Sequence, residues 1–346
     1  MPQRANLAVA AFLTFIAALA MIRTAAHGVG YPSETVPALA NSNKEDEKSI
    51  PTFDHSRPMD PTEIDSRTVG ALATGWLYEA YAGRISERAV RNGEWSLRIG
   101  EQWFVWSDGR LLPEEERVGT EEYSSIRFYD YRLGEHEVPD YDEEFVEMMR
   151  MRYAGDGPGD DVWIERGRHQ AFYEALYDVT SLQEADRAME RTTFLGYGTR
   201  VHPMLIEPLR RVEADIYEAA SDDESVAAFV RNIRQVSGFF WRDIFGSASR
   251  SFHSYGAAVD LLPRNWRGGF GYWRWAQQSG IVEWWSLPLR LRFTVPQPIV
   301  DAFERHDFVW GGKWVGFDPI HFEYRPEVIR YAEYRESAEG SGLRLY

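Results

Sequence analysis

The chain has 346 residues, no cysteine and a formal net charge of −16 at pH 7. Without cysteine, disulfides, thiolate metal sites and cysteine nucleophiles are excluded. The acidic balance argues against a basic patch for nucleic acid or anionic lipid, so we expect no nucleic acid partner. The length is sufficient for two ordinary domains, each with its own core.

The N-terminus has the pattern of an export signal. In residues 1–26, Arg4 supplies a positive start, an apolar run covers residues 5–22, and small residues follow it. The run is also about as long as a minimal membrane span, so it is either cleaved or kept as a membrane tether. In both cases we expect the remainder outside the cytoplasm, in the periplasm or at the cell surface. Residues 27–61, rich in Pro, Ser, Asn and charge, are predicted to be a flexible linker.

Residues 62–196 form a region whose role the sequence does not reveal. Apolar periodicity and turn residues predict helices at 69–81, 145–152, 170–179 and 182–190, and a hairpin joining 94–99 to 102–106. Its aromatic residues either line a glycan or peptide groove or, as is more common, pack in a core. These residues are Trp103, Trp106, Phe128, Tyr129 and Tyr131. His136 and His169 have no partners at ligand spacing, so we interpret them as structural.

Residues 197–335 are predicted to form a second domain, followed by a polar tail at 336–346. Its expected helices cover 203–220, 225–236, 271–278 and 298–305, and its expected strands cover 257–262 and about 320–324. Periodicity alone supports a mixture of helices and strands. His202 and His306 are predicted to cap or pack against helices.

Two short segments of this domain carry residues typical of a metal site. The segment SFHSYGAAVD contains His253 and Asp260, and the segment DPIHFE contains Asp318, His321 and Glu323. Two imidazoles and a carboxylate, with a fourth position left for water, are the ligand set of a catalytic zinc site. Asp318 is then a spare carboxylate that can take a proton from that water. A single histidine beside a strand is more often structural, so the prediction depends on both segments together.

These segments resemble the zinc D-Ala-D-Ala carboxypeptidases and L-Ala-D-Glu endopeptidases of bacterial cell walls. The family, which includes VanY-type enzymes, has the pattern SxHxxGxAxD, then WGGxW, then DxxHFE. The matching residues are Ser251, His253, Gly256, Ala258, Asp260, Trp310, Gly311, Gly312, Trp314, Asp318, His321, Phe322 and Glu323. The resemblance covers roughly residues 201–327. It departs from the family at Leu262, where many members have Asn, and in a long Trp-rich insert between Asp260 and Trp310.

The resemblance implies specific roles and a fold. His253, Asp260 and His321 are the expected Zn²⁺ ligands, Asp318 the general base, and Arg242 the residue that polarises the scissile carbonyl. The implied fold is α+β, a small antiparallel sheet with packed helices of the hedgehog/DD-peptidase type. Ser251 and Glu323 are predicted to orient ligands.

The expected function is hydrolysis of peptidoglycan stem peptides, with D-alanyl-D-alanine carboxypeptidase activity favoured. An L-Ala-D-Glu type endopeptidase and a non-catalytic wall-binding protein with structural zinc remain open. Asp318 argues against the last, because a structural zinc site needs no base.

Overall fold

The computed structural model describes residues 66–107, 109–117, 122–124, 131–153, 167–244 and 247–337. All of them belong to one compact unit, Asp60–Tyr346. The predicted signal, the linker, most of the tail, and the aromatic residues Phe128 and Tyr129 lie outside the described residues. None of the helices in the described ranges combines the length and the apolar character needed to cross a membrane.

The N-terminal part of the unit is an antiparallel sheet backed by a helix. The strands are β1 (Ile85–Arg91), β2 (Glu94–Ile99), β3 (Gln102–Ser107) and β4 (Arg110–Pro113), in that order. Asn92 and Gly93 both have positive φ angles, as a two-residue hairpin turn requires. That turn joins β1 to β2. The predicted hairpin is confirmed by the antiparallel pairing of β2 with β3, and β1 and β4 extend it on both sides.

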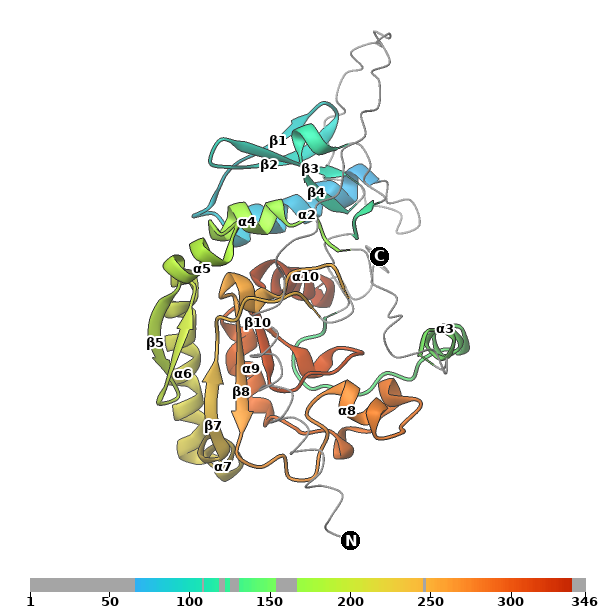
Figure 1. Cartoon of the computed structure of the whole chain (residues 1–346), viewed down its shortest axis with the longest axis vertical. Coiled ribbons are helices and arrows are strands. Elements are labelled where there is room, and N and C mark those ends of the chain that lie inside the picture. The colour runs from blue at the N-terminus through green and yellow to red at the C-terminus, as the bar shows by residue number, and fades with distance from the viewer. Residues whose placement is uncertain are drawn as a thin grey trace, which may run out of the picture. The chain divides into compact units, whose positions relative to one another are not determined.

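Helix α2 (Ser66–Ala80) lies between this sheet and the C-terminal helix α10 (Pro326–Ser337), as Figure 1 shows. Trp76 of α2 packs against the rings of Tyr331 and Tyr334, with centroids 5.2 and 5.4 Å apart. One continuous apolar core runs from α2 and the sheet to the strands of the C-terminal half. The region of unknown role and the predicted peptidase domain therefore share a core.

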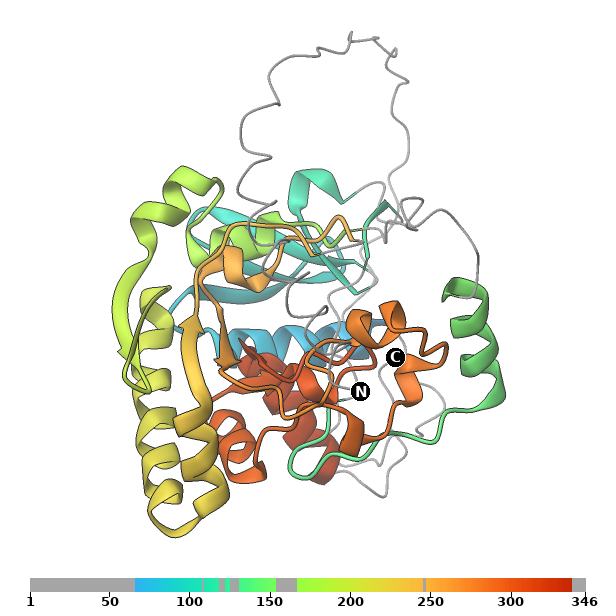
Figure 2. The ribbon, with the colours of Figure 1, turned by 60° about the horizontal axis from the view of Figure 1, so that its bottom comes forward.

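The second sheet holds the candidate site. Its strand order is β7 (Ile233–Ser237), β8 (Ala258–Pro263), β10 (His321–Tyr324) and β9 (Phe308–Trp310), all antiparallel. The long helix α6 (Ile206–Asp222) runs beside β7 and β8, and packs against α7 and α9, as Figures 1 and 2 show. Helices α7 and α9 are Glu224–Asn232 and Gln297–Arg305. The predicted α+β class, with small antiparallel sheets and packed helices, is confirmed.

Shorter elements connect these layers. They are α4 (Ala171–Tyr177), α5 (Leu182–Ala188), and the hairpin of β5 (Glu190–Phe194) and β6 (Tyr197–Val201). His202 caps the next turn, where its Nδ1 accepts a hydrogen bond from the backbone N–H of Met204, and His306 is the C-cap of α9. Both capping predictions are confirmed.

The helix predicted at 225–236 was too long. Helix α7 ends at Asn232, and Ile233–Ser237 forms strand β7 instead. Val236 pairs with Leu261 of β8, and both are buried. Sheet pairing, which favours β-branched residues such as Ile233 and Val236, therefore overrides the helical spacing.

The Trp-rich insert forms a satellite core with a distant helix. Helix α3 (Glu143–Tyr153) inserts Met149 beside Trp284, Trp285 and Phe317. In the insert itself, α8 covers Trp273–Gln278. The insert is thus packed by a segment from the N-terminal region, which the sequence does not reveal.

Gly256 is the glycine on which the site geometry depends. Its φ is +62°, and a Cβ there would overlap Met189 and lie 2.5 Å from the backbone N of His202. Gly256→Ala should therefore lower the free energy of unfolding by about 2–4 kcal/mol, the backbone strain adding to a steric overlap. Urea unfolding followed by circular dichroism measures this loss.

Gly196→Ala is the matched control. Gly196 also has positive φ, +80°, but its Cβ would meet nothing within 4 Å. It should lose only about 1–2 kcal/mol. Equal losses in the two variants would contradict the steric part of the argument.

Candidate metal centre

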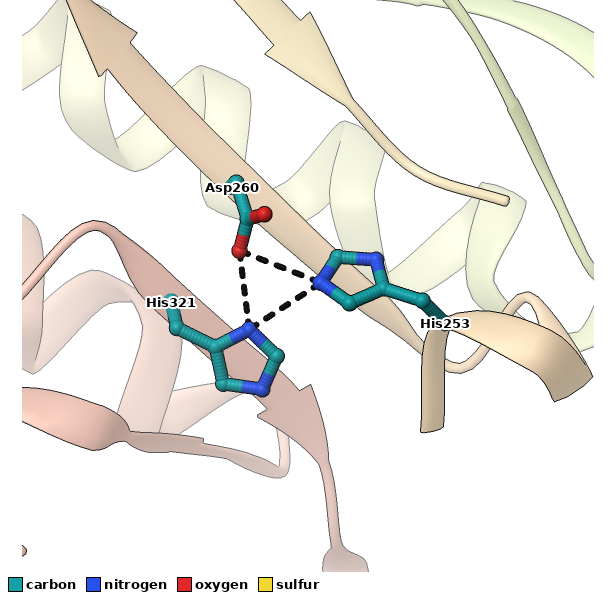
Figure 3. Close-up of side chains that lie close together, drawn as sticks. All are labelled: His253, Asp260 and His321. Carbon is teal, nitrogen blue, oxygen red and sulfur yellow. Dashed lines mark hydrogen bonds and ion pairs between the residues drawn. The ribbon is translucent and has the colours of Figure 1, made fainter. Parts of the chain in front are cut away.

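Three side chains converge on one point, as Figure 3 shows. Nε2 of His253 lies 3.1 Å from Oδ1 of Asp260 and 3.1 Å from Nδ1 of His321. Nδ1 of His321 lies 2.8 Å from the same carboxylate oxygen. Within the described ranges, this is a group of metal-ligating residues whose ligand atoms all lie within 4.8 Å of one another.

The local structure explains the convergence. Asp260 on β8 and His321 on β10 are direct partners across the antiparallel ladder. Side chains of such partners stand next to each other on one face of the sheet. His253 lies in the 3₁₀ turn Phe252–Tyr255, and Gly256 reverses the chain directly into β8. The seven-residue spacing between His253 and Asp260 therefore covers the rest of this turn, Gly256 and the first residues of β8.

Neighbouring groups fix the tautomer of each histidine. Nδ1 of His253 donates to the carbonyl of Gly238, 2.5 Å away, so its Nε2 lone pair faces the site. Nε2 of His321 donates to Oε1 of Glu323, 3.0 Å away, so its Nδ1 faces the site. Such partners orient metal-binding imidazoles and raise their basicity. The orienting role expected of Glu323 stays a prediction, and this hydrogen bond supports it.

The ligand set fits a divalent cation. Atoms placed 2.0–2.1 Å from a tetrahedral zinc are separated by roughly 3.3 Å, close to the three separations here. Two nitrogen lone pairs and a carboxylate oxygen at such distances repel one another unless a proton or a cation lies between them. His253 and His321 are almost fully buried, which adds to that cost. His253, Asp260 and His321 are therefore the residues that would hold the ion.

The protonation of these groups reflects their mutual contacts. Burial alone would lower the pKa of His321, but hydrogen bonds to Asp260 and Glu323 raise that pKa to about 10. Burial disfavours the charged form of Asp260, yet the two histidines hold its pKa well below the usual range. In the metal-free protein, the His321 ring therefore carries the positive charge that balances the site.

Asp318 lies next to this group. Its backbone N–H donates to the carbonyl of Gly311 at 2.9 Å, and its own carbonyl accepts from the backbone N–H of His321 at 3.1 Å. Burial raises the pKa of Asp318 to about 7, and the charges of Asp260 and Glu323 add to the rise, against His321 and Arg242. A cation bound nearby would lower this pKa, because it favours the charged form.

The WGG segment holds the turn that carries Asp318 and His321. The indole N–H of Trp310 donates to the carbonyl of Pro319 at 2.8 Å. A Cβ at Gly311 would lie 2.7 Å from the carbonyl oxygen of Asp318 and 3.3 Å from Cβ of His321. Gly311 thus permits a close approach that any larger residue would disturb.

Arg242 is exposed, and its guanidinium makes no hydrogen bond or ion pair within the described ranges. It is close enough to Asp318 for their charges to interact. The backbone of Arg242 is held by Ser254, whose hydroxyl accepts from its N–H and donates to its carbonyl, both at 2.8 Å. The hydroxyl of Ser251 forms no hydrogen bond with the three ligand side chains, so the orienting role expected of it stays a prediction.

Comparison with known proteins agrees with this geometry. Residues 245–324 match a family described as D-alanyl-D-alanine carboxypeptidase. This match supports the resemblance to that peptidase family for this part of the chain. The match contains the three candidate ligands and Asp318 but not Arg242, and it supports a peptidoglycan-related peptidase, which is a hydrolytic enzyme. Residues 74–128 match a domain of unknown function. No curated protein and no solved structure matches the chain.

Several residues that support the peptidase site were not found from the sequence. Gly238 contributes only a backbone carbonyl, for which no side-chain signal exists. Ser254 lies inside the first motif, one residue after His253. Its hydrogen bond with the backbone of Arg242, 12 positions away, leaves no pattern in the sequence. Arg325 could have been found, because it continues the alternation of His321 and Glu323 along β10.

Metal binding should release a proton. Because Nδ1 of His321 is protonated below a pKa of about 10 in the metal-free protein, the ion must displace that proton. The apparent affinity for Zn²⁺ should therefore rise at least tenfold per pH unit between pH 6 and pH 8, and more steeply below pH 7, where Asp318 also holds a proton before the cation binds. Calorimetric titration in buffers of different ionisation enthalpy should show about one proton released per ion at pH 8 and more than one at pH 6. An affinity that does not change with pH would contradict the assignment of His321.

Proposed function

We propose that the protein is a zinc-dependent D-alanyl-D-alanine carboxypeptidase that acts on peptidoglycan stem peptides outside the cytoplasm. The observation that carries this proposal is the convergence of His253, Asp260 and His321 beside the free carboxylate of Asp318. A structural zinc site is normally closed by four protein ligands and needs no base. Three ligands with an adjacent carboxylate are the arrangement of a hydrolytic centre.

The chain's own residues supply the proton transfers. Zinc, when bound by the three ligands, would act as a Lewis acid toward the scissile carbonyl and lower the pKa of a water molecule. The carboxylate of Asp318 accepts the proton from the attacking water and later donates it to the leaving amine. Burial raises the pKa of Asp318 above the ordinary value for a carboxyl group before metal binding. A bound cation lowers this pKa, so that Asp318 is a charged carboxylate able to accept the proton.

Arg242 contributes positive charge near Asp318. Its side chain is exposed and its guanidinium is not used by the fold within the described ranges, so it remains available to substrate. A guanidinium placed there stabilises the negative charge that develops on the carbonyl oxygen during attack. The hydroxyl of Ser254 binds the backbone N–H and carbonyl of Arg242, and these two hydrogen bonds fix the position of the Arg242 Cα.

Asp318→Asn tests the proposed base. The variant should bind zinc as the wild type does, because Asp318 is not one of the three converging ligands. Its kcat should fall about 10²- to 10⁴-fold, the usual contribution of a general base. Asp186→Asn, at an exposed residue paired with Arg200, is the control and should keep full activity. Near-normal turnover by Asp318→Asn would remove Asp318 as the base.

Arg242→Ala tests the proposed electrophilic role. Loss of one such stabilising group typically reduces kcat about 10²- to 10³-fold. The zinc content should not change, because Arg242 makes no contact with the ligand side chains. Arg231→Ala, at an exposed residue paired with Glu224, is the control. A change in KM alone would show that Arg242 only binds substrate.

The activity itself is tested with stem pentapeptide and tetrapeptide analysed by mass spectrometry after incubation with the zinc-loaded protein. Loss of the terminal D-Ala would establish the carboxypeptidase. Internal fragments cut between L-Ala and D-Glu would establish an endopeptidase instead. Zinc binding without cleavage would indicate a wall-binding protein.

A further inference from the structure

A continuous series of buried polar side chains leads from the metal ligand His321 to the N-terminal region. His321, Glu323 and Arg325 occupy alternate positions of β10 and its continuation, so they share one face. The series then passes to Glu327 in the first turn of α10 and ends at Tyr81, directly after α2. The two ends are 240 residues apart in the chain, and every member of the series is less than one-tenth exposed.

Each carboxylate in the series uses its two oxygens for two different neighbours. Oε1 of Glu323 accepts from His321, and Oε2 lies 3.4 Å from Nη1 of Arg325. Oε1 of Glu327 accepts from Nε of Arg325 at 2.6 Å, and Oε2 accepts from the hydroxyl of Tyr81 at 2.8 Å. The orientation of each carboxylate is therefore linked to that of the next group.

The guanidinium of Arg325 is held on its face as well as at its edge. It stacks on the ring of Phe252, 4.7 Å from the centroid, and Arg168 lies 4.9 Å from the same ring. Phe252 is buried and directly precedes the ligand His253. Arg325 thus contacts Glu323, which binds His321, and Phe252, which precedes His253. A rotation of the guanidinium plane would disturb both contacts.

We propose that Tyr81 is a positioning residue for the metal centre. Its hydroxyl donates to Oε2 of Glu327, and this contact orients the carboxylate whose other oxygen binds Arg325. Arg325 in turn lies against Oε2 of Glu323, so that Oε1 of Glu323 accepts the hydrogen bond from His321. The inference rests on the metal site of the proposed function and adds a role for the N-terminal region. That region, which matches a domain of unknown function from residue 74 onward, supplies an orienting group for the peptidase site.

The test compares two tyrosine variants in the full-length protein. Tyr81→Phe removes the hydroxyl that Glu327 accepts, and keeps the ring. Tyr173→Phe is the matched control, because its hydroxyl is also buried but has no hydrogen-bond partner among the residues that the structure describes. Charges of Arg325 and Glu327 also act on Tyr173, so both changes are made in the same buried surroundings.

Zn²⁺ affinity is measured by competition with a chromophoric chelator, at a temperature where circular dichroism shows every variant folded. Tyr81→Phe should weaken binding about three- to tenfold, less than the roughly 10- to 100-fold expected when Glu323→Gln removes a direct partner of a ligand. Tyr173→Phe should bind like the wild type. In the Co²⁺-substituted protein, the visible absorption bands should shift in Tyr81→Phe and not in Tyr173→Phe.

The outcomes separate this inference from the proposed function. If Glu323→Gln weakens binding while Tyr81→Phe and Tyr173→Phe have equal affinities and equal Co²⁺ spectra, the role of Tyr81 is overturned and the metal site stands. If the wild-type protein binds neither ion, the metal site fails and this inference fails with it. A selective effect of Tyr81→Phe on affinity and spectrum supports the series of contacts, since a general loss of stability would not change the ligand field.

Discussion

The antiparallel pairing of β8 with β10 is the constraint on which the site depends. It places Asp260 directly opposite His321, although 61 residues separate them in the chain. A shift of the register by one residue would turn one of the two side chains to the opposite face of the sheet. Val259 and Phe322 pair on the opposite face of the sheet and are buried, and Phe322 stacks on Phe303 of α9. These apolar contacts hold the register.

The site concentrates ionisable groups that are costly to bury separately. Asp260, Asp318 and Glu323 bring negative charge to a place where His321 and Arg325 supply positive charge nearby. Burying such groups is tolerated when each is paired and hydrogen-bonded. The fold meets this condition in the metal-free protein by keeping His321 protonated, and a divalent cation would take over that role.

The N-terminal region belongs to the same structural unit as the peptidase domain. Its helix α2 packs on α10, its helix α3 packs on the Trp-rich insert, and Tyr81 reaches the network behind the metal ligands. A region that shares a core in this way cannot be removed without exposing apolar surface. In the role proposed for Tyr81, this region also supports the side chains that orient the candidate metal ligands.

The candidate ligands, the candidate base and most helices could be predicted from the amino-acid sequence, because these depend on residues close together in the chain. His253 and Asp260 belong to one turn and strand, and Asp318 and His321 to another, so their local spacing carries the information. Three features could be found only in the folded chain: α7 ends at Asn232, the carbonyl of Gly238 orients His253, and Tyr81 contacts Glu327, 246 positions away. Such contacts are made by a backbone carbonyl, a sheet partner or a distant hydroxyl, which leave no periodic pattern in the sequence.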